Sequence, residues 1–402
     1  MKTREVKLGE VANVKGGKRI PKGIGLINIP NGHPYIRVRD LNNKRLLELD
    51  NSYEYVDNET QKVISKYTVK TGDVVLSIVG TIGLVAIVGR TLDGANLTEN
   101  CVKLSSFHGV NRDFLYYYLR SDCGQQEIRC GTVGAVQAKL PIKNIQNIAI
   151  NLPDYTTQER IASLLLSIDR KIELNQKIND NLEQQAVALF KSWFVDFSLF
   201  GGTVPENWED TTLENITTLI TRGIAPKYSD NSDQTVVNQK CIRNHTIDLS
   251  LARTHTPKAI NEKWLKFGDL LINSTGDGTL GRVAQVWFTP KALTVDSHVT
   301  IVRPAREELI FYIGLWGILH EKEIESLHTG STGQTELPRD RVKMLKLLLP
   351  DDSSLSRFNS IIAPMASTII SNQEENQKLA SLRDTLLPKL MSGEIDVSNI
   401  QL

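Results

Sequence analysis

The stretch Gln158–Phe197, QERIASLLLSIDRKIELNQKINDNLEQQAVALFKSWFVDF, decides the fold of this chain. It contains neither glycine nor proline, so no residue in it strongly disfavours a helix. Apolar residues recur at alternating steps of four and three, which is the pattern of the narrow stripe along which two long helices pack. At about 1.5 Å per residue such a helix is roughly 60 Å long. It cannot bury its stripe alone, so the sequence predicts a long helix with a helical partner.

The partner helix is predicted in the same chain, because the stripe recurs 197 residues further on, from Phe358. Two asparagines recur with the apolar positions. Asparagine at such a position lowers stability but fixes the register, because its amide needs a polar partner across the interface. The predicted seam consists of Ile161, Leu165, Ile168, Ile172, Asn175, Asn179 and Leu182 in the first helix and Ile362, Ile369, Asn372, Asn376 and Leu379 in the second.

Two residues depart from this match. Arg383 stands where the first copy has Ala186. Pro364 is expected to kink the second helix or to mark its start, since proline removes a backbone donor and clashes with the preceding turn. Two ordinary amphipathic helices in separate cores remain the alternative to one paired seam.

The repeat continues outside the two helices. Residues 72–77 are matched by 268–273, and 80–83 by 278–281. Tyr35-Ile-Arg37 is matched to Cys241-Ile-Arg243. The offset between the copies drifts along the chain, so loop lengths differ while the order is kept. The chain is therefore predicted to consist of a domain, a long helix, a second domain and a second long helix.

Both domains are predicted to mix α and β structure. Short β-branched runs between turn residues indicate strands at 73–78, 84–88, 270–273 and 282–288. Helices are expected at 111–120 and 309–320. The predicted fold class is α/β (α+β): two similar domains separated by two antiparallel coiled-coil helices, with a pseudo-two-fold internal repeat. The predicted bounds are 1–153 for the first domain, 154–200 for the first helix, 201–350 for the second domain and 351–402 for the second helix and tail.

The charge of the chain is unevenly distributed. The net charge is +1, but residues 1–150 carry 21 Lys and Arg against 14 Asp and Glu, a balance of +7. Excess positive charge on one domain favours a polyanionic partner. The first residues lack the apolar core of a signal peptide, and the apolar stretch 74–89 is too short to span a membrane. The four cysteines form no CxxC pair, which favours the reducing cytoplasm and neither a zinc site nor a disulfide framework.

Two similar domains on a rigid spacer suit a DNA target in two parts. Two-headed DNA-binding proteins contact half-sites about one helical turn, 34–36 Å, apart. The two domains are diverged copies, so the predicted target is bipartite and asymmetric.

The segment Leu379–Asp396, LASLRDTLLPKLMSGEID, resembles the C-terminal signature of specificity subunits of type I restriction-modification systems. Pro205-Glu-Asn-Trp208, Gln239-Lys-Cys-Ile-Arg243 and Gln158-Glu-Arg-Ile-Ala162 resemble the same family. The resemblance implies two target recognition domains that each read half of a split site. It also implies two docked adenine methyltransferase subunits that use S-adenosylmethionine, and a motor-nuclease subunit that can join them. The chain itself would then be non-catalytic and hold no cofactor or metal.

The candidate DNA-binding residues lie in loops. Cations in a glycine-rich loop suit phosphates, whereas Arg, Asn and Gln suit base edges. For each group a solvated loop, an ion-paired strand end or a polar turn is the alternative. The candidates are Lys15, Lys18, Arg19, Lys22, Arg37, Arg39, Ser77, Thr81, Gln137 and Lys139 in the first domain, and Arg222, Lys227, Arg243, Asn244, His245, Ser274, Thr275, Asp277, Thr279, Thr332 and Gln334 in the second.

Three other functions are weighed against DNA specificity. The chain could be a two-headed DNA-binding scaffold without a methyltransferase partner, or a coiled-coil adaptor for proteins. Residues 276–281 fit GxGxxG, but a dinucleotide site needs a helix directly after this loop. The residues that follow are β-like, so a turn between strands is predicted. The sequence contains neither a Pro-Pro pair for an adenine methyltransferase loop nor a GxxxxGK[ST] motif.

Overall fold

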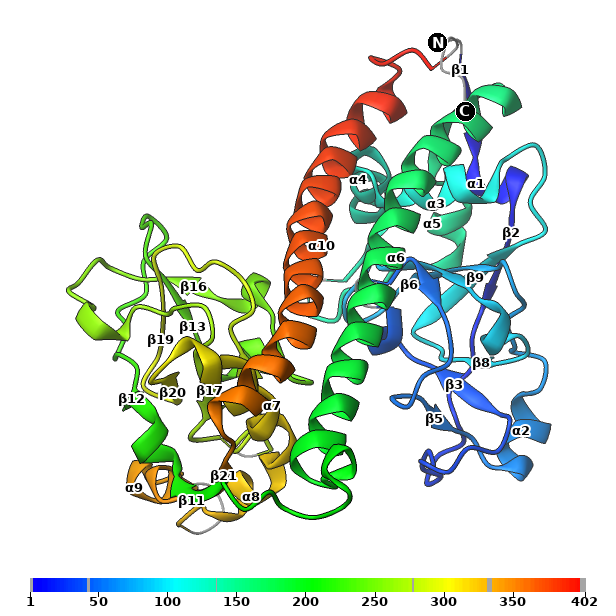
Figure 1. The fold of residues 1–402 in the computed structure, drawn as a ribbon. Helices are drawn as coiled ribbons and strands as arrows, with labels where there is room; N and C mark the ends of the chain where they lie inside the picture. The colour runs from blue at the N-terminus through cyan, green and yellow to red at the C-terminus, as the bar shows by residue number, and fades with distance from the viewer. Residues whose placement is uncertain (1–2, 42–43, 135, 277, 331–334, 398–402) are drawn as a thin grey trace. The chain divides into compact units, whose positions relative to one another are not determined.

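The computed structural model describes residues 3–41, 44–134, 136–276, 278–330 and 335–397. The chain forms two compact units, and each contains parts that are distant in sequence (Figure 1). The first unit comprises residues 1–172 with 377–402, and the second comprises 173–376. Each unit therefore holds one mixed α/β domain and a segment of both long helices. The domain bounds expected from the sequence remain a prediction.

The two long helices are α6, Tyr155–Phe194, and α10, Asp352–Ser392. Helix α6 ends three residues before the end of the stretch 158–197 and six before the predicted bound at residue 200. Phe197, beyond the helix, adopts a left-handed conformation with φ 51°. Pro364 lies well inside α10, so the expectation that it marks the start of the helix is wrong. The helix continues through the proline at the cost of one backbone hydrogen bond.

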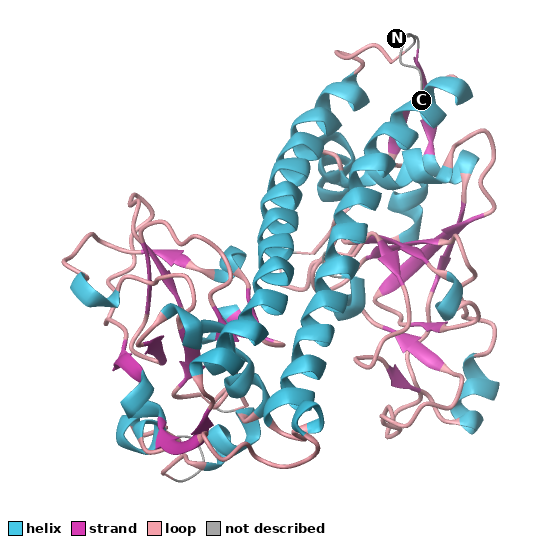
Figure 2. Ribbon diagram, viewed as in Figure 1, coloured by secondary structure: helices cyan, strands magenta, loops and turns pink. Residues whose placement is uncertain are grey.

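The first unit is built around a five-stranded sheet with strand order β2-β9-β6-β7-β4. Figure 2 distinguishes the helices, strands and loops of the chain by colour. Neighbouring strands are antiparallel except β4 and β7. A three-stranded sheet, β5-β3-β8, and the pair β1-β10 complete the domain. The strands are β1 Thr3–Lys7, β2 Asn13–Gly16, β3 Pro34–Ile36, β4 Leu46–Leu47, β5 Glu54–Tyr55, β6 Val74–Ser77, β7 Val85–Val88, β8 Asn96–Leu97, β9 Cys101–Ser105 and β10 Ala149–Pro153. The helices are α1 Leu8–Val11, α2 Asn58–Ile64, α3 Arg112–Arg120, α4 Asp122–Gly131 and α5 Ile142–Gln146, with short 3-10 turns at Val38–Leu41 and Arg90–Leu92.

The second unit repeats this plan. Its main sheet has the order β12-β20-β17-β18, beside a three-stranded sheet β16-β13-β19 and the pairs β11-β21 and β14-β15. The strands are β11 Glu209–Thr212, β12 Thr217–Arg222, β13 Thr235–Val237, β14 Ile242–Arg243, β15 Thr246–Ile247, β16 Arg253–Thr254, β17 Leu270–Asn273, β18 Val283–Gln285, β19 Leu293–Val295, β20 Val299–Pro304 and β21 Lys346–Leu349. The helices are α7 Ile310–Leu319, α8 Glu321–Ser326 and α9 Arg339–Lys343, with 3-10 turns at Ser198–Phe200, Leu213–Ile216, Gln239–Cys241, Leu249–Leu251, Asn261–Lys263 and Glu307–Leu309.

Equivalent hydrogen bonds show how closely the two domains correspond. The amide of Gly17 donates to the carbonyl of Cys101, and Gly223 donates to Val299 in the same way. A β-carbon on Gly17 would lie 2.1 Å from the oxygen of Thr98, and one on Gly223 would lie 1.9 Å from a carbonyl oxygen. Only glycine lets these two backbones approach so closely.

The same comparison corrects one part of the predicted repeat. The carbonyl of Ile36 accepts a hydrogen bond from the amide of Thr98, and Val237 accepts one from Asp296. Ile36 therefore corresponds to Val237, and Arg37 corresponds to Asn238 instead of Arg243. The error came from matching two short Ile-Arg pairs across segments that differ in loop length. Arg243 instead lies in the hairpin β14-β15.

Within the first unit, α6 and α10 are joined by buried polar contacts as well as apolar ones. Ile161, Leu165 and Leu390 share a core with the sheet. Asp169, 4% exposed, accepts from the Arg383 guanidinium at 2.8 Å and from the Tyr117 hydroxyl at 2.6 Å. Arg383, the residue that departs from the sequence repeat, thus forms an ion pair with Asp169 of α6.

Within the second unit, the asparagines pair across the helices. The Asn175 amide donates to Asn376 at 2.9 Å and to Glu375 at 2.7 Å. The Asn372 amide donates to Asn179 at 2.8 Å. The paired residue numbers run in opposite directions, so these two segments are antiparallel. Of the predicted seam positions, Ile161, Leu165, Ile168, Asn175, Asn179, Ile362 and Ile369 are buried, and Ile172, Leu182, Asn372, Asn376 and Leu379 are half-buried.

The aromatic residues at the end of α6 pack inside the second unit. Phe194 lies 4.8 Å from Phe358 and 5.5 Å from Trp208, measured between ring centroids. Phe190 and Trp193 belong to the same core. This cluster fixes the end of the helix to its own domain. Among the described residues, none of the helices meets the length and hydropathy needed to cross a membrane.

We predict that Asp169→Ala lowers the free energy of unfolding by about 2–4 kcal/mol, because it leaves the Tyr117 hydroxyl without its acceptor and Arg383 with only the exposed carboxylate of Asp384. The matched control is Asp384→Ala, which removes the other carboxylate on Arg383 from an exposed position. It should cost no more than about 1 kcal/mol. Chemical denaturation of the full chain measures both changes, and equal losses would contradict the assignment.

The paired asparagines make a second prediction. Asn372→Leu alone should destabilise the chain by about 1–3 kcal/mol, because it leaves Oδ1 of the buried Asn179 without its hydrogen-bond donor. Adding Asn179→Leu should recover most of this loss, since two leucines can pack across the seam. A double-mutant cycle by denaturation tests this, and additive effects would show that the two amides do not interact.

Candidate nucleic-acid interface

The main sheet of the first unit gathers several candidate residues at one end. Strands β2 and β6 end there at Gly16 and Ser77, while β9 and β7 begin there. We name this end, with the loops 17–19, 78–84, 98–100 and 136–139, the first loop edge. The bridge between Val79 and Lys139 brings the last of these loops to the strand ends. Lys18, Arg19, Thr81, Gln137 and Lys139, which are separated by up to 121 positions, thus meet on one edge.

The cations of the first loop edge face solvent. Lys18 and Lys139 are exposed, and the Arg19 side chain is 80% exposed although it pairs with Glu99 at 2.7 Å. The Lys18 ammonium lies 5.7 Å from the centre of the Tyr67 ring. Lys15 on β2 and Lys22 beyond the edge are exposed as well. Exposed cations on flexible side chains can reach phosphates without large desolvation, which gives affinity independent of sequence.

Arg37 and Arg39 are held by acidic partners. Arg37 pairs with Glu54, and Arg39 pairs with Glu54 at 2.6 Å and with Asp40 at 3.3 Å. Asp40 also accepts from the amide of Arg37 at 2.7 Å. This arrangement is the ion-paired strand end that the sequence left as the alternative to a base contact. Burial raises the pKa of Asp40 to about 6, against the opposing charge of Arg39.

Two serine candidates are corrected by their burial. Ser77 is 0% exposed, donates to the carbonyl of Thr81 and accepts from the amide of Leu84. Ser274 is 0% exposed and bonds the Thr300 hydroxyl at 2.5 Å. Both hydroxyls are buried and hydrogen-bonded within their own domains, so the fold does not present either of them to a ligand. The sequence could not show this burial, because β6 and β17 are buried on both faces and have no alternation of apolar and polar residues.

The second unit has an equivalent edge. Strands β12 and β17 end there at Arg222 and Asn273, while β20 and β18 begin there. We name this end, with the described loop residues 223–224, 274–276, 278–281, 296–298 and 335–336, the second loop edge. Arg222 is half-buried, pairs with Glu336 at 2.7 Å and donates to the carbonyl of Leu337 at 3.0 Å. It is therefore less available to phosphates than the cations of the first loop edge.

The threonines of the second loop edge take different roles. The Thr275 hydroxyl lies 2.7 Å from Nδ1 of His298, and Thr279 donates to the carbonyls of Thr275 and Gly276. Strand β18 follows this loop, as the turn interpretation predicts. Lys227 is exposed. Asp277, Thr332 and Gln334 lie outside the described residues.

The cluster Arg243, Asn244 and His245 forms a hairpin tip. Asn244 and His245 have φ of 51° and 60°, which is typical of a type I′ turn. All three residues are exposed, and Nε2 of His245 lies 3.3 Å from the Glu321 carboxylate at the start of α8. The strands of this hairpin pack on β18. His245 thus contacts its own domain, whereas Arg243 and Asn244 stay free to contact a ligand.

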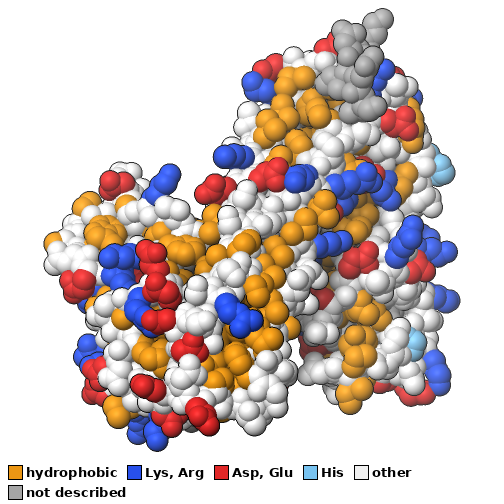
Figure 3. All heavy atoms as spheres, in the orientation of Figure 1, with side chains coloured by type: hydrophobic (Ala, Val, Ile, Leu, Met, Phe, Trp, Pro, Cys, Tyr) orange, Lys and Arg blue, Asp and Glu red, His pale blue; other side chains and the backbone are white. Residues whose placement is uncertain are grey.

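Sequence reasoning missed several polar residues at the two edges, namely Asn100, Gln239, His298 and Glu336. Each is isolated in the sequence, and only the hydrogen bonds of the sheet ends place it beside the other candidates. The missed signal was weak: Asn100 and His298 each stand one residue before a strand. On the face drawn in Figure 3, basic and acidic side chains are interspersed over the second unit.

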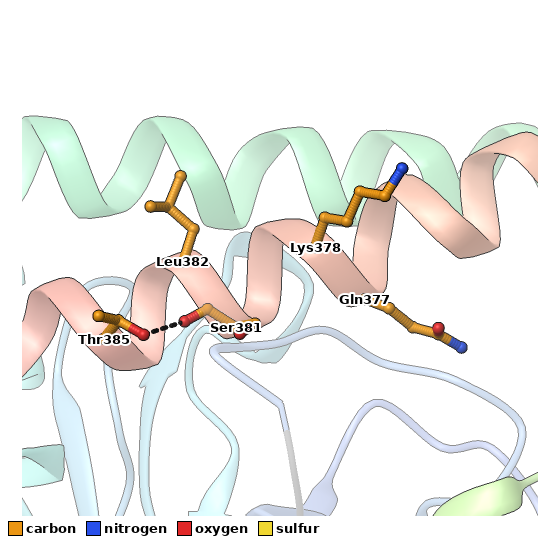
Figure 4. A pocket seen from close by; sticks show the side chains of 5 residues that line it. All are labelled: Gln377, Lys378, Ser381, Leu382 and Thr385. Atoms are coloured by element: carbon orange, nitrogen blue, oxygen red, sulfur yellow. Dashed lines mark hydrogen bonds between the residues drawn. The ribbon is translucent and has the colours of Figure 1, made fainter.

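A separate hollow lies on α10 in the first unit (Figure 4). It is lined by Gln377, Lys378, Ser381, Leu382 and Thr385, and the Thr385 hydroxyl donates to the carbonyl of Ser381 at 2.8 Å. All five residues come from one helix. Small-molecule sites normally have polar groups that converge from several elements, so this hollow does not have the character of such a site.

Residues 2–184 match the type I restriction modification DNA specificity domain family. The chain is therefore similar to this family over its first domain and most of α6. It is 25% identical over 393 residues to the type I restriction enzyme MjaIX specificity subunit of Methanocaldococcus jannaschii. The alignment covers 91% of this chain and 88% of that relative. It is 23% identical to the HindI specificity subunit of Haemophilus influenzae, covering 67% and 73%. The type I restriction-modification S subunit of M. genitalium has the same fold, with a TM-score of 0.54, 15% identity and coverage of 97% of this chain and 99% of that one.

We predict that Asp40→Asn flattens the pH dependence of stability between pH 4 and 7. The folded-state pKa of Asp40 lies above its ordinary value of 3.8, so its contribution is complete below that value and is lost as pH rises through about 6. The loss amounts to at most about 3 kcal/mol. Thermal unfolding across this pH range measures it.

The control for this prediction is Asp93→Asn. Hydrogen bonds from the Thr71 amide and hydroxyl lower the pKa of the exposed Asp93, so its contribution is lost on acidification instead. This variant should leave the slope between pH 5 and 7 unchanged. An equal slope for wild type and Asp40→Asn over that range would show that Asp40 is not the responsible group.

Proposed function

We propose that this chain reads a bipartite, asymmetric DNA target, one half with each domain, and positions modification and restriction subunits on it. The supporting observation is one hydrogen-bonded frame that occurs twice with different side chains at its loop edge. Positions equivalent to Arg222, Thr275 and Glu336 of the second domain are occupied by Gly16, Val79 and Lys139 in the first. A common frame with different polar edges suits two half-sites of different sequence.

The family assigns this chain recognition, and the chemistry belongs to its partners. In this proposal two adenine methyltransferase subunits dock on the paired helices and use S-adenosylmethionine, and a motor-nuclease subunit joins them to cleave DNA. The specificity subunit itself is not an enzyme and binds no cofactor or metal. The complex acts on double-stranded DNA in the cytoplasm.

The two domains contribute differently to affinity. The first loop edge carries exposed Lys18, Arg19 and Lys139, whereas Arg222 on the second is paired with Glu336. Residues 1–150, which form most of the first domain, also carry the excess of positive charge in the sequence. The first domain therefore supplies more of the electrostatic contacts to the DNA phosphates, and the second domain binds DNA more through neutral polar contacts.

The proposed function is tested by expressing the chain with its methyltransferase subunit and mapping methylated adenines across the host genome. The expected result is one motif with two different defined halves and a constant gap. Methylation at a single undivided motif, or none in the presence of an assembled complex, would contradict the proposal. Binding of the chain to protein but not to duplex DNA at low salt would favour the adaptor alternative.

A prediction about affinity follows from the exposed cations. Lys18→Ala with Arg19→Ala should weaken binding of the complex to all duplexes alike and lower the slope of log K against log salt by about 1–2. The methylated motif should stay the same. The matched control is Arg4→Ala with Lys7→Ala, which removes two exposed cations from β1, outside the main sheet. A changed motif, or an equal effect of the control, would show that the loop cations do not hold phosphates.

A further inference from the structure

His298 of the second loop edge is an exposed side chain that is held in place. Its amide donates to the Asp296 carboxylate at 2.9 Å, and its carbonyl accepts from the amide of Ser274 at 2.8 Å. Its ring nitrogen Nδ1 lies 2.7 Å from the Thr275 hydroxyl. Exposed side chains usually rotate freely, and ordering them costs conformational entropy. Here the cost is already met in the free protein, which is the property of a preorganised binding residue.

The backbone beneath His298 is fixed as well. Gly223 packs so closely on this loop that a β-carbon would lie 1.9 Å from the carbonyl oxygen of Val295 and 2.4 Å from that of Asp296. Asp296 is 4% exposed. The loop is therefore clamped between β12 and the end of β17, and the imidazole projects from a rigid base.

The chemistry of the ring suits a base edge. Because Nδ1 is engaged by Thr275, Nε2 is the nitrogen left for a ligand. In one tautomer Nε2 donates to N7 or O6 of a purine, and in the other it accepts from the amino group of adenine or cytosine. Phosphates are more often held by flexible cations, as on the first loop edge. A fixed imidazole with one free nitrogen matches a single directional contact in the major groove.

We propose that His298 is a specificity-determining residue that reads one base pair of the half-site bound by the second domain, and that Thr275 is its positioning residue. This inference rests on the proposed function. In the first domain, the amide of Ile78 donates to the carbonyl of Asn100. This hydrogen bond corresponds to the one from the amide of Ser274 to the carbonyl of His298, so Asn100 is the equivalent of His298. Val79 occupies the position of Thr275 there, so the hydroxyl that holds the ring is particular to the second domain.

The test uses the full chain in complex with its methyltransferase subunit, and it maps methylated adenines for wild type and variants. His298→Ala should reduce discrimination at one base pair of one half-site by about tenfold, and the other half-site and the gap should stay unchanged. Thr275→Val, which places the first domain's residue in the second, should relax the same base pair to a smaller extent. His108→Ala, an exposed histidine of the first domain, is the control and should leave the motif intact.

The outcomes separate this inference from the proposed function. If the wild-type complex methylates no split motif, the proposed function fails. If the wild type reads a split motif and His298→Ala reads it with the same discrimination, the role of His298 is overturned while the function stands. Relaxation spread evenly over both half-sites would overturn it too. If His298→Ala yields no active complex, Thr275→Val decides, and unchanged discrimination by that variant counts against the inference.

Discussion

The structure depends on the burial of the apolar stripes of α6 and α10. An isolated helix with such a stripe would expose it to water, so each segment needs a partner, and in each unit the other long helix supplies it. The helix segments do not form a separate layer. Ile161 and Leu165 share one core with the first domain, and Phe190 and Ile362 share another with the second. Each domain is therefore anchored on the helix pair of its own unit.

Polar contacts fix the register that apolar packing leaves open. Leucine and isoleucine side chains at a seam tolerate a shift by one turn, whereas the Asp169–Arg383 ion pair and the Asn179–Asn372 amide pair do not. Both contacts are costly to bury and are compensated only in one alignment. The helices thus hold their domains in a defined place within each unit, as the proposed function requires if each loop edge is to meet a particular base.

Sequence recognition then depends on what a common frame presents at its edge. The backbone hydrogen bond that Gly17 donates in the first domain corresponds to the one that Gly223 donates in the second. The hydrogen bonds donated by the amides of Leu140 and Leu337 correspond in the same way. The frame leaves the edge residues free to differ, so exposed cations occupy the first edge and a paired arginine with a clamped histidine occupies the second. In the proposed function, contacts to the phosphate backbone and contacts to bases are therefore divided unequally between the two domains.

The sequence by itself determined the two long helices, the internal repeat, the mixed α/β class and the likeness to type I specificity subunits, because periodicity and local motifs are short-range properties of a chain. It also identified the loops that form the edges. Tertiary structure decided which candidate residues remain free to contact a ligand. Ser77 and Ser274 are buried, and Arg37 and Arg39 form ion pairs with Glu54 and Asp40. It also aligned the repeat correctly between Ile36 and Val237, and it assembled the site of His298 from residues 223, 275 and 296. Exposure and ion pairing depend on contacts between residues far apart in the chain, so the fold alone sets them.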